Sequence, residues 1–272
     1  MATEYSYREV SFLLETVQPS LLSKVDTIRG DPSIVEGILE QESEKLVGRL
    51  MSMGEEELLS HVSPRFLFEV LLWYAVRQLR HQRYTFERTA DHDLPVFDAD
   101  KVVRFLSNRS MVRYLADMLS SFTRIESISI PIRVRKGVWR RVRFNDMDVD
   151  SLVRLCEVAK EGERFAYYKR IADVCLFILG VFPEHVHSDF RAPLGEIMAR
   201  IPRRLRRSAE DYEEDGRRFY RMAAEQEEAR ASELDEVLWL LHEDFDLAKK
   251  PLDFISRHCL YLHRQKLFPT EP

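Results

Sequence analysis

The residues with the clearest chemistry in this sequence are a group of cations between positions 127 and 145. This segment holds six positive side chains and no acid, although the chain of 272 residues has a formal net charge of -5. Guanidinium groups bind phosphates and carboxylates through two parallel hydrogen bonds, so clustered arginines suit a polyanionic ligand. The group consists of Arg133, Arg135, Lys136, Arg140, Arg141 and Arg143, with Trp139 among them.

The pattern around these cations predicts a β-hairpin with two different faces. Even-numbered positions from Ile128 to Val134 are apolar and alternate with serine, proline or arginine, which is the period-2 pattern of a half-buried strand. Lys136-Gly137 is expected to form the turn, and Pro131, which has no N–H for a sheet ladder, places the first strand at an edge. The expected basic face carries Arg133, Arg135, Arg141 and Arg143 beside Trp139.

Three helices are expected before this hairpin, over residues 64 to 83, 98 to 108 and 110 to 122, with a loop over 84 to 97. Asp98 is expected to cap the second of these helices. The order helix, helix, tight turn, helix, hairpin is that of a winged helix-turn-helix, in which the third helix enters the major groove and the hairpin follows the backbone. Arg109 and Arg113, on or near the third helix, would then extend a polyanion-binding surface.

Three interpretations of the basic hairpin stay open at this point. It could contact nucleic acid, dock on an acidic protein surface, or be a solvated sheet edge whose charges prevent edge-to-edge pairing. The third helix carries Asp117 and no Asn or Gln suited to base contacts, so sequence-specific reading of DNA is disfavoured.

Composition predicts a mainly α fold, a multi-helix bundle with this one hairpin, for which a winged-helix-like middle is one option. The chain has only 9 glycines and 11 prolines, and 45 % of its residues are apolar. Several helices are expected over residues 5 to 60, separated at Pro19, at 30 to 32 and at 53 to 54. The expected domains are an N-terminal helical segment (1–62), the helices with the hairpin (63–146) and a C-terminal helical bundle (147–272).

The C-terminal part is expected to contain a helix from about Phe165 to Leu179 and a long helix from about Ser208 to Asp246. Apolar residues of the long helix recur at spacings of three and four, which fits one helix of a bundle better than an intermolecular coiled coil. A second arginine cluster precedes it, and Arg206 and Arg207 lie four residues before Glu210 and Asp211. Such pairs would neutralise much of this cluster on a solvated helix face.

Metal-binding and catalytic patterns are weak in this sequence. The run 184 to 187 contains one Glu-x-x-His step, but no second step to complete a di-iron site, and no glycine-rich phosphate loop occurs. Asp173 lies in the most apolar helix, with Lys169 one turn earlier as a partner for a structural ion pair. We therefore assign no catalytic residue, metal or cofactor, and keep an enzyme with a buried site near Asp173 and His185 as a third alternative.

Two stretches resemble a pattern in uncharacterised bacterial helical proteins. They are residues 173 to 184 and the residues Tyr212, Gly216 and Tyr220, which are spaced four apart, and together they cover about 50 residues. The resemblance implies a bacterial source, no particular activity and a structural role in which Gly216 allows close helix packing.

The chain is expected to be cytoplasmic. Its start lacks the features of a signal peptide, its apolar runs are too short to span a bilayer, and its three cysteines are an odd number far apart. The sequence thus favours a non-enzymatic regulatory or accessory protein that contacts DNA, RNA or another polyanion through the hairpin. The alternative is an adaptor that docks on an acidic partner protein through the hairpin and the long C-terminal helix.

Overall fold

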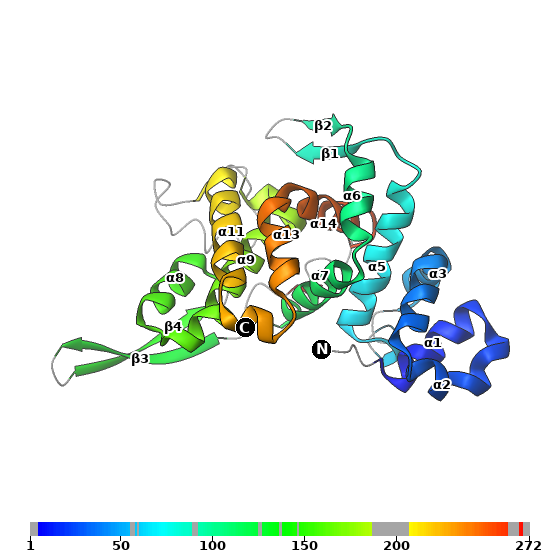
Figure 1. The fold of residues 1–272 in the computed structure, drawn as a ribbon, viewed down its shortest axis with the longest axis horizontal. Coiled ribbons are helices and arrows are strands. Elements are labelled where there is room, and N and C mark those ends of the chain that lie inside the picture. Colours follow the sequence, from blue (N-terminus) through cyan, green and yellow to red (C-terminus); the bar gives the residue numbers. More distant parts are fainter. Residues whose placement is uncertain are drawn as a thin grey trace. The chain divides into compact units, whose positions relative to one another are not determined.

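The computed structural model describes residues 5–54, 58, 60–88, 92–124, 127–135, 138–145, 147–186, 207–260 and 267–268, with strands 127–135 and 138–145 described by their backbone. The predicted mainly helical fold is confirmed. The described residues also form two small sheets, each of two strands (Figure 1). No helix in these ranges has both the length and the apolar content to cross a membrane.

The chain forms two compact units, each built from separate stretches of sequence. Unit 1 comprises Met1–Glu87, Asp93–Ser121 and Lys250–Tyr261, and unit 2 comprises Arg88–His92, Phe122–Lys249 and Leu262–Pro272. The three helices expected before the hairpin therefore belong to unit 1, whereas the hairpin belongs to unit 2. The three consecutive domains expected from the sequence stay a prediction.

The elements of unit 1 begin with a helical N-terminal region and end with the second half of a C-terminal helix. They are α1 (Tyr7–Val17), η1 (Pro19–Lys24), α2 (Val25–Arg29), α3 (Pro32–Ser52), α5 (Pro64–Leu79), β1 (Thr85–Arg88), β2 (Asp93–Val96), α6 (Ala99–Leu106), α7 (Arg109–Ser121) and the part of α14 (Phe245–His258) from Lys250 on.

Local sequence explains why the helices of unit 1 begin where they do. Ser63 caps α5 by accepting a hydrogen bond from the Phe66 N–H, with Pro64 in the first turn, as predicted. Asp31 caps α3 in the same way, followed by Pro32. α5 lies against α3 and α7 and is buried over most of its length, with Phe68 and Trp73 among its largest buried side chains. It is the central helix of this unit.

The loop expected over residues 84 to 97 was wrong, because β1 and β2 form a short sheet there. Asp98, expected to cap α6, makes no such hydrogen bond. Its carboxylate instead accepts a hydrogen bond from the Thr85 hydroxyl at 2.5 Å and lies 3.7 Å from the Lys250 ammonium. A long-range contact to the strand has replaced the local cap.

The elements of unit 2 start with the basic hairpin and continue as helices. They are β3 (Ser127–Arg135), β4 (Val138–Asn145), α8 (Val149–Val158), η2 (Glu161–Glu163), α9 (Arg164–Val181), η3 (Pro183–His185), α11 (Ala209–Ala224), α12 (Glu227–Ala231), α13 (Asp235–Glu243) and the first turn of α14, up to Lys249. α9 and α11 pack together, and α13 packs on α11.

The single long helix expected from 208 to 246 was wrong, because the chain breaks it into α11, α12, α13 and the start of α14. Glu233 adopts a left-handed conformation with φ of 57°, and the Leu234 N–H bonds back to the Ala229 carbonyl at 2.9 Å, which closes α12. The apolar residues of the expected stripe pack against other parts of the same chain, since Leu238, Leu241 and Phe245 are fully buried. An intermolecular coiled coil on this stripe is therefore excluded.

Candidate polyanion interface

The predicted β-hairpin is present as β3 and β4, an antiparallel ribbon of two strands (Figure 1). We call it the basic ribbon. In its register, Arg133 is opposite Trp139, Pro131 is opposite Arg141 and Ser129 is opposite Arg143. Directly opposite residues, and residues two apart on a strand, belong to the same face of an antiparallel ladder. One face thus holds the positions of three arginines and the tryptophan.

The tip of the ribbon differs from a regular hairpin. A register shift between Arg133 and Arg135 sets Arg135 opposite Val138, and Arg140 is opposite Ile132. Arg135 and Arg140 therefore occupy positions in the other series, although Arg135 was expected on the face of Arg133. The expected turn at Lys136-Gly137 lies outside the described residues.

The second series of positions is apolar toward the start of β3. Ile128 is opposite Phe144, and Ile130 is opposite Val142. The register thus gives one face three arginine positions and the tryptophan, whereas the other face is apolar near the start of β3 and carries Arg135 and Arg140 toward the tip. Because both strands lie at an edge of a two-stranded sheet, the absence of an N–H on Pro131 is tolerated, as expected.

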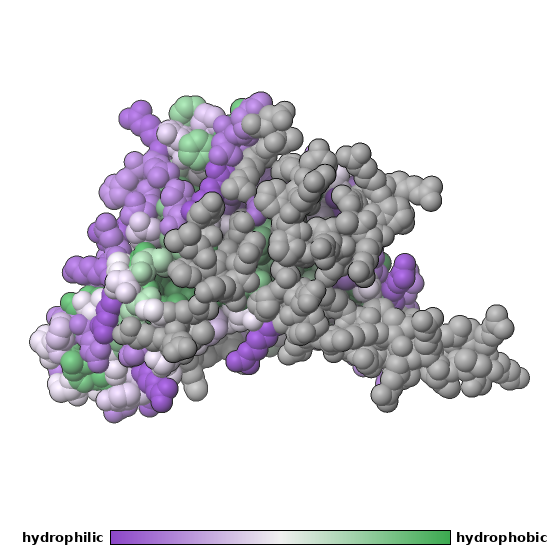
Figure 2. Space-filling view, turned by 180° about the vertical axis from the view of Figure 1, so that it is seen from behind, coloured by the Kyte–Doolittle hydropathy of each residue, from purple (hydrophilic) through white to green (hydrophobic). Residues whose placement is uncertain are grey.

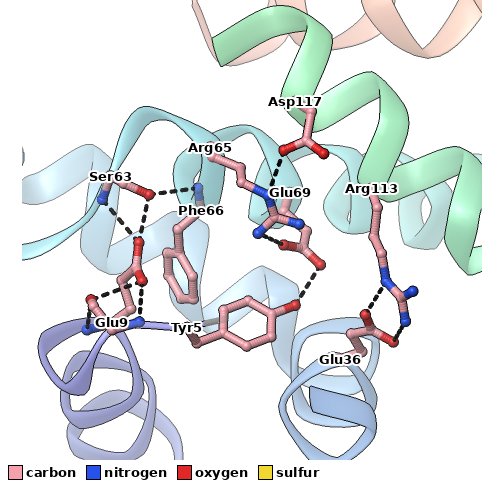
Figure 3. A network of polar contacts seen from close by, with 10 residues as sticks. Tyr5, Glu9, Glu36, Ser63, Arg65, Phe66, Glu69, Arg113 and Asp117 are labelled. Carbon is pink, nitrogen blue, oxygen red and sulfur yellow. Dashed lines mark hydrogen bonds and ion pairs between the residues drawn. The ribbon is translucent and has the colours of Figure 1, made fainter. Parts of the chain in front are cut away.

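Arg109 and Arg113, the other two cations predicted to bind the polyanion, lie against acids of unit 1. Arg113 binds Glu36 through two parallel hydrogen bonds of 2.5 and 2.9 Å, and Glu36 is only 1 % exposed (Figure 3). Arg109 lies 3.6 Å from Glu36 and 3.8 Å from Glu40. The hydrogen bond to Glu36 raises the pKa of Arg113. These contacts join α7 to α3.

A second acid of unit 1 lies deeper. Glu69 of α5 is fully buried and accepts hydrogen bonds from the Tyr5 hydroxyl at 2.7 Å and from Arg65 at 3.1 Å. Arg65 also binds Asp117 of α7 at 2.6 Å, so the cation bridges two acids (Figure 3). Burial raises the pKa of Glu69, and the charge of Arg65 opposes this effect. Burial and the charge of Glu69 also raise the pKa of Tyr5.

A third acid ties two helix starts together. Glu9 forms a capping box with Ser6 at the start of α1. Its other carboxylate oxygen accepts a hydrogen bond of 2.5 Å from the Ser63 hydroxyl at the start of α5 (Figure 3). One carboxylate therefore caps one helix and holds the cap residue of another.

The buried acid of unit 2 has the role that the sequence predicted. Asp173 is 2 % exposed and pairs with Lys169 at 2.7 Å, and it also accepts a hydrogen bond of 2.9 Å from Tyr220 on α11. The structural ion pair is confirmed. The side chain of His185, named with Asp173 in the enzyme alternative, lies outside the described residues.

Gly216 allows close helix packing, as the resemblance implied. A Cβ atom at this position would lie 2.5 Å from Cε2 of Phe245 and 3.2 Å from Cβ of Cys175. Tyr212 and Tyr220, one turn to either side, are buried. The spacing of four thus marks the face of α11 that packs on α9 and on the start of α14.

The second arginine cluster falls mostly on 200 to 206, outside the described residues. Arg207 is described, and it binds Asp215 on α11 and Asp150 on α8 rather than Asp211. Asp211 instead forms the capping box of α11 with Ser208. The expected pairing of Arg207 with Asp211 was wrong, because the acid three residues into a helix is the one that can reach the cap residue's N–H.

Metal chemistry finds no support in the described part of the chain, where no three His, Cys, Asp or Glu residues gather as a metal site would require. The three cysteines, all within the described ranges, are free. Burial raises the pKa of the Cys175 and Cys259 thiols to about 12.

An exposed aromatic cluster on the β1–β2 sheet was missed by the sequence reasoning. The ring of Tyr84 contacts those of Phe86 and Phe97 edge to face, with centroids 5.4 and 6.1 Å apart. Phe97 is 77 % exposed, and Leu94 nearby is 46 % exposed. Apolar areas reach the surface among hydrophilic ones in the space-filling view (Figure 2). The alternation around Thr85 was a usable signal, but Pro95 and the acids of this stretch suggested a loop.

No family model, curated protein or solved structure matches this chain. The residues and their geometry are therefore the only basis for a functional conclusion, and the resemblance to bacterial helical proteins stays a prediction.

Proposed function

We propose that this protein is a non-enzymatic regulatory or accessory protein that binds a polyanion, DNA or RNA, through the basic ribbon. The observation that carries the proposal is the register of β3 and β4, which sets Arg133, Arg141, Arg143 and Trp139 in one face series. Successive arginine positions on β4 are then about 7 Å apart along the strand. Such a row of guanidinium groups can donate to a succession of phosphates.

The surroundings of other arginines support this choice of site. Arg65, Arg113, Arg207 and Arg217 each bind carboxylates of the chain within 3.2 Å, and their charges are neutralised locally. The segment 127 to 145 contains no acid that could do the same. A local positive potential in a protein of net negative charge is what a polyanion would select.

A winged-helix mode of binding is the finer form of the proposal. The chain order α5, α6, α7, ribbon fits it, although the three helices belong to unit 1 and the ribbon to unit 2. Because Arg113 on α7 is already bound to the buried Glu36, we place the phosphate contacts on the ribbon alone.

The test is fluorescence anisotropy of labelled DNA and RNA titrated with the full chain at about 50 and about 200 mM salt. One variant replaces Arg133, Arg135, Arg141 and Arg143 by alanine. A matched control makes the same change of charge at four exposed arginines elsewhere, which are Arg8, Arg83, Arg154 and Arg230. Both variants are checked for wild-type helix content by circular dichroism.

We expect salt-sensitive binding that the ribbon variant loses and the control keeps, with the salt slope reduced by roughly one for each phosphate contact removed. Equal weakening by both variants would mean that only net charge matters, and it would overturn the ribbon as the site. A folded wild-type chain that binds none of the probes would overturn the proposed function itself.

An adaptor that binds a protein is the second candidate, and the exposed aromatic cluster on the β1–β2 sheet favours it. Exposed aromatic groups mark interaction surfaces more often than single exposed apolar residues do. Arg83, next to Tyr84, is exposed and suits an acidic partner. A labelled peptide of alternating glutamate and leucine is the probe: binding lost in Phe97→Ser but kept in the four-arginine ribbon variant would favour the adaptor.

A further inference from the structure

Trp139 is the one aromatic position in the arginine series of the basic ribbon. It is opposite Arg133 and two residues from Arg141, so cations stand on two sides of it in the ladder. Pro131, opposite Arg141, adds an apolar ring position to the same series. In two successive pairs of the ladder, an arginine position therefore stands opposite a ring position.

An aromatic position with arginine positions around it is suited to a nucleic acid strand whose bases are unpaired. Every base has an aromatic face that can stack on an indole, whereas in a duplex those faces are covered by neighbouring base pairs. Phosphates beside an unpaired base would meet the guanidinium groups on either side. Stacking and phosphate contacts do not depend on base identity. The series fits this kind of binding, because Asn145 is its one position with a carboxamide that could read a base edge.

We infer that the polyanion bound by the basic ribbon is a single-stranded nucleic acid, with one base stacked on Trp139 and its flanking phosphates bound by Arg133, Arg141 and Arg143. This inference rests on the proposed function and narrows its ligand. Binding is expected to tolerate changes of base sequence and to prefer a single strand over the duplex of the same sequence.

The experiment compares a labelled single strand with its duplex at one salt concentration, using full-length Trp139→Phe and Trp139→Leu. Phenylalanine keeps a ring that can stack, and leucine keeps apolar bulk without one. The matched control is Trp239→Leu, because Trp239 is a partly exposed tryptophan on α13 in the same unit. Thermal melts check that each variant folds as the wild type does.

We expect Trp139→Leu to weaken single-strand binding by about 5- to 150-fold, the range given by loss of one stacked base. Trp139→Phe should retain most of the affinity, Trp239→Leu all of it, and duplex binding should change little in any variant. Arginine substitutions in the ribbon should weaken both probes.

The outcomes separate this inference from the function on which it rests. Duplex binding as tight as single-strand binding, with both Trp139 variants unchanged, would overturn the stacking inference and leave the polyanion proposal intact. Loss of binding in Trp139→Leu for both probes equally would also overturn it, since stacking on an unpaired base predicts a difference between them. Failure of the wild type to bind either probe would overturn the proposed function.

Discussion

The arginines of unit 1 and those of the basic ribbon differ in the carboxylates that lie near them in the chain. In unit 1, Arg65 and Arg113 reach Glu69 and Glu36, two acids that are almost wholly inaccessible to solvent. Arg65 and Glu69 are four positions apart, but the bonds of Glu69 to Tyr5, of Arg65 to Asp117 and of Arg113 to Glu36 each join residues more than 50 positions apart. In unit 2, the arginines of the basic ribbon lie in a segment without a single acid. Unit 1 uses these cations to hold helices together, whereas the ribbon segment supplies no acid of its own to its arginines.

The interiors of the two units also differ in their buried acids and in how closely their helices pack. Among the described residues, unit 1 contains four buried acids, Glu9, Glu36, Glu69 and Asp98, whereas unit 2 contains Asp173. Around Gly216, unit 2 relies on contact between α9, α11 and the start of α14 that is too close for a Cβ atom. The comparison teaches that a predicted binding arginine has to be judged by the carboxylates within its reach, which the sequence alone does not show.

Removal of the Glu69 carboxylate is expected to have the largest effect on folding. Glu69→Ala leaves Arg65 without its buried partner and Tyr5 without its acceptor, and it should lower the free energy of unfolding by about 3–5 kcal/mol. Urea denaturation of the full chain measures this loss. Glu69→Gln, which retains an acceptor for Tyr5, is the milder control. Losses below about 1 kcal/mol in both variants would show that the acid network does not hold unit 1 together.

Arg113 and Arg109 test whether the cations of α7 are structural. Arg113→Ala leaves the buried Glu36 with only the more distant Arg109, so we expect a loss of about 2–3 kcal/mol in unfolding free energy. Arg109→Ala should cost less than about 1 kcal/mol, because this side chain is partly exposed and 3.6 Å from Glu36. Thermal and urea unfolding report both. The reverse order of the two effects would contradict this assignment.

Gly216→Ala tests the packing of unit 2. The added methyl group would overlap Phe245 and should destabilise the fold by about 1–3 kcal/mol, since overpacking forces neighbouring side chains away. Gly37→Ala is the matched control, because a Cβ at Gly37 meets no atom within 4 Å. A stable Gly216→Ala variant with unchanged melting would mean that the helices have room to separate.

The raised pKa of Glu69 predicts a dependence of stability on pH. Between the ordinary carboxyl pKa of 4.5 and the raised value in the fold, the native state binds more protons than the unfolded state. The contribution of this group is therefore fully present below 4.5 and is lost as pH rises through the raised value. Urea midpoints are measured for wild type and Glu69→Gln from about pH 4 to pH 7, and the wild-type midpoint should fall relative to that of Glu69→Gln as the pH rises. A difference that grows in favour of the wild type with rising pH would contradict this sign.

The four-arginine ribbon variant should have the smallest effect on stability. No acid lies within the ribbon segment to be left unpaired, so each substitution should change the unfolding free energy by less than about 0.5 kcal/mol. The same variant should lose polyanion binding, and the contrast with Arg113→Ala is the sharpest test of the two roles of arginine. A ribbon variant that unfolds would show that these cations are structural as well.

Local sequence was enough to predict the helices whose ends are marked by caps. Ser63-Pro64 was predicted to start α5 and does so, because the Ser63 hydroxyl binds an N–H group only three positions away; the predicted break at 30 to 32 precedes α3, which Asp31 caps. The alternation from Ile128 to Val134 likewise predicted β3, since apolar and polar residues alternate along a strand whose two faces have different surroundings. Features that depend on neighbours in sequence were therefore accessible without a fold.

The errors came where a distant contact outweighed a local one. Asp98 binds Thr85 instead of capping α6, and Arg207 binds Asp150 and Asp215 instead of the acid one turn later. The expected long C-terminal helix is interrupted at Glu233, which has a left-handed backbone conformation although it is not a glycine. In each case the partner lies far along the chain or the backbone conformation has no marker residue.

By itself the sequence determined a mainly helical protein with a basic hairpin and an Asp173–Lys169 ion pair, since each depends on periodicity, capping or a spacing of one helical turn. Only the tertiary structure decided which arginines pair with a carboxylate. Glu36 and Arg113 are 77 residues apart, and their pairing exists because α3 and α7 both pack on α5. Charge is a property of residues, but whether it is neutralised depends on which segments the fold brings within hydrogen-bonding distance.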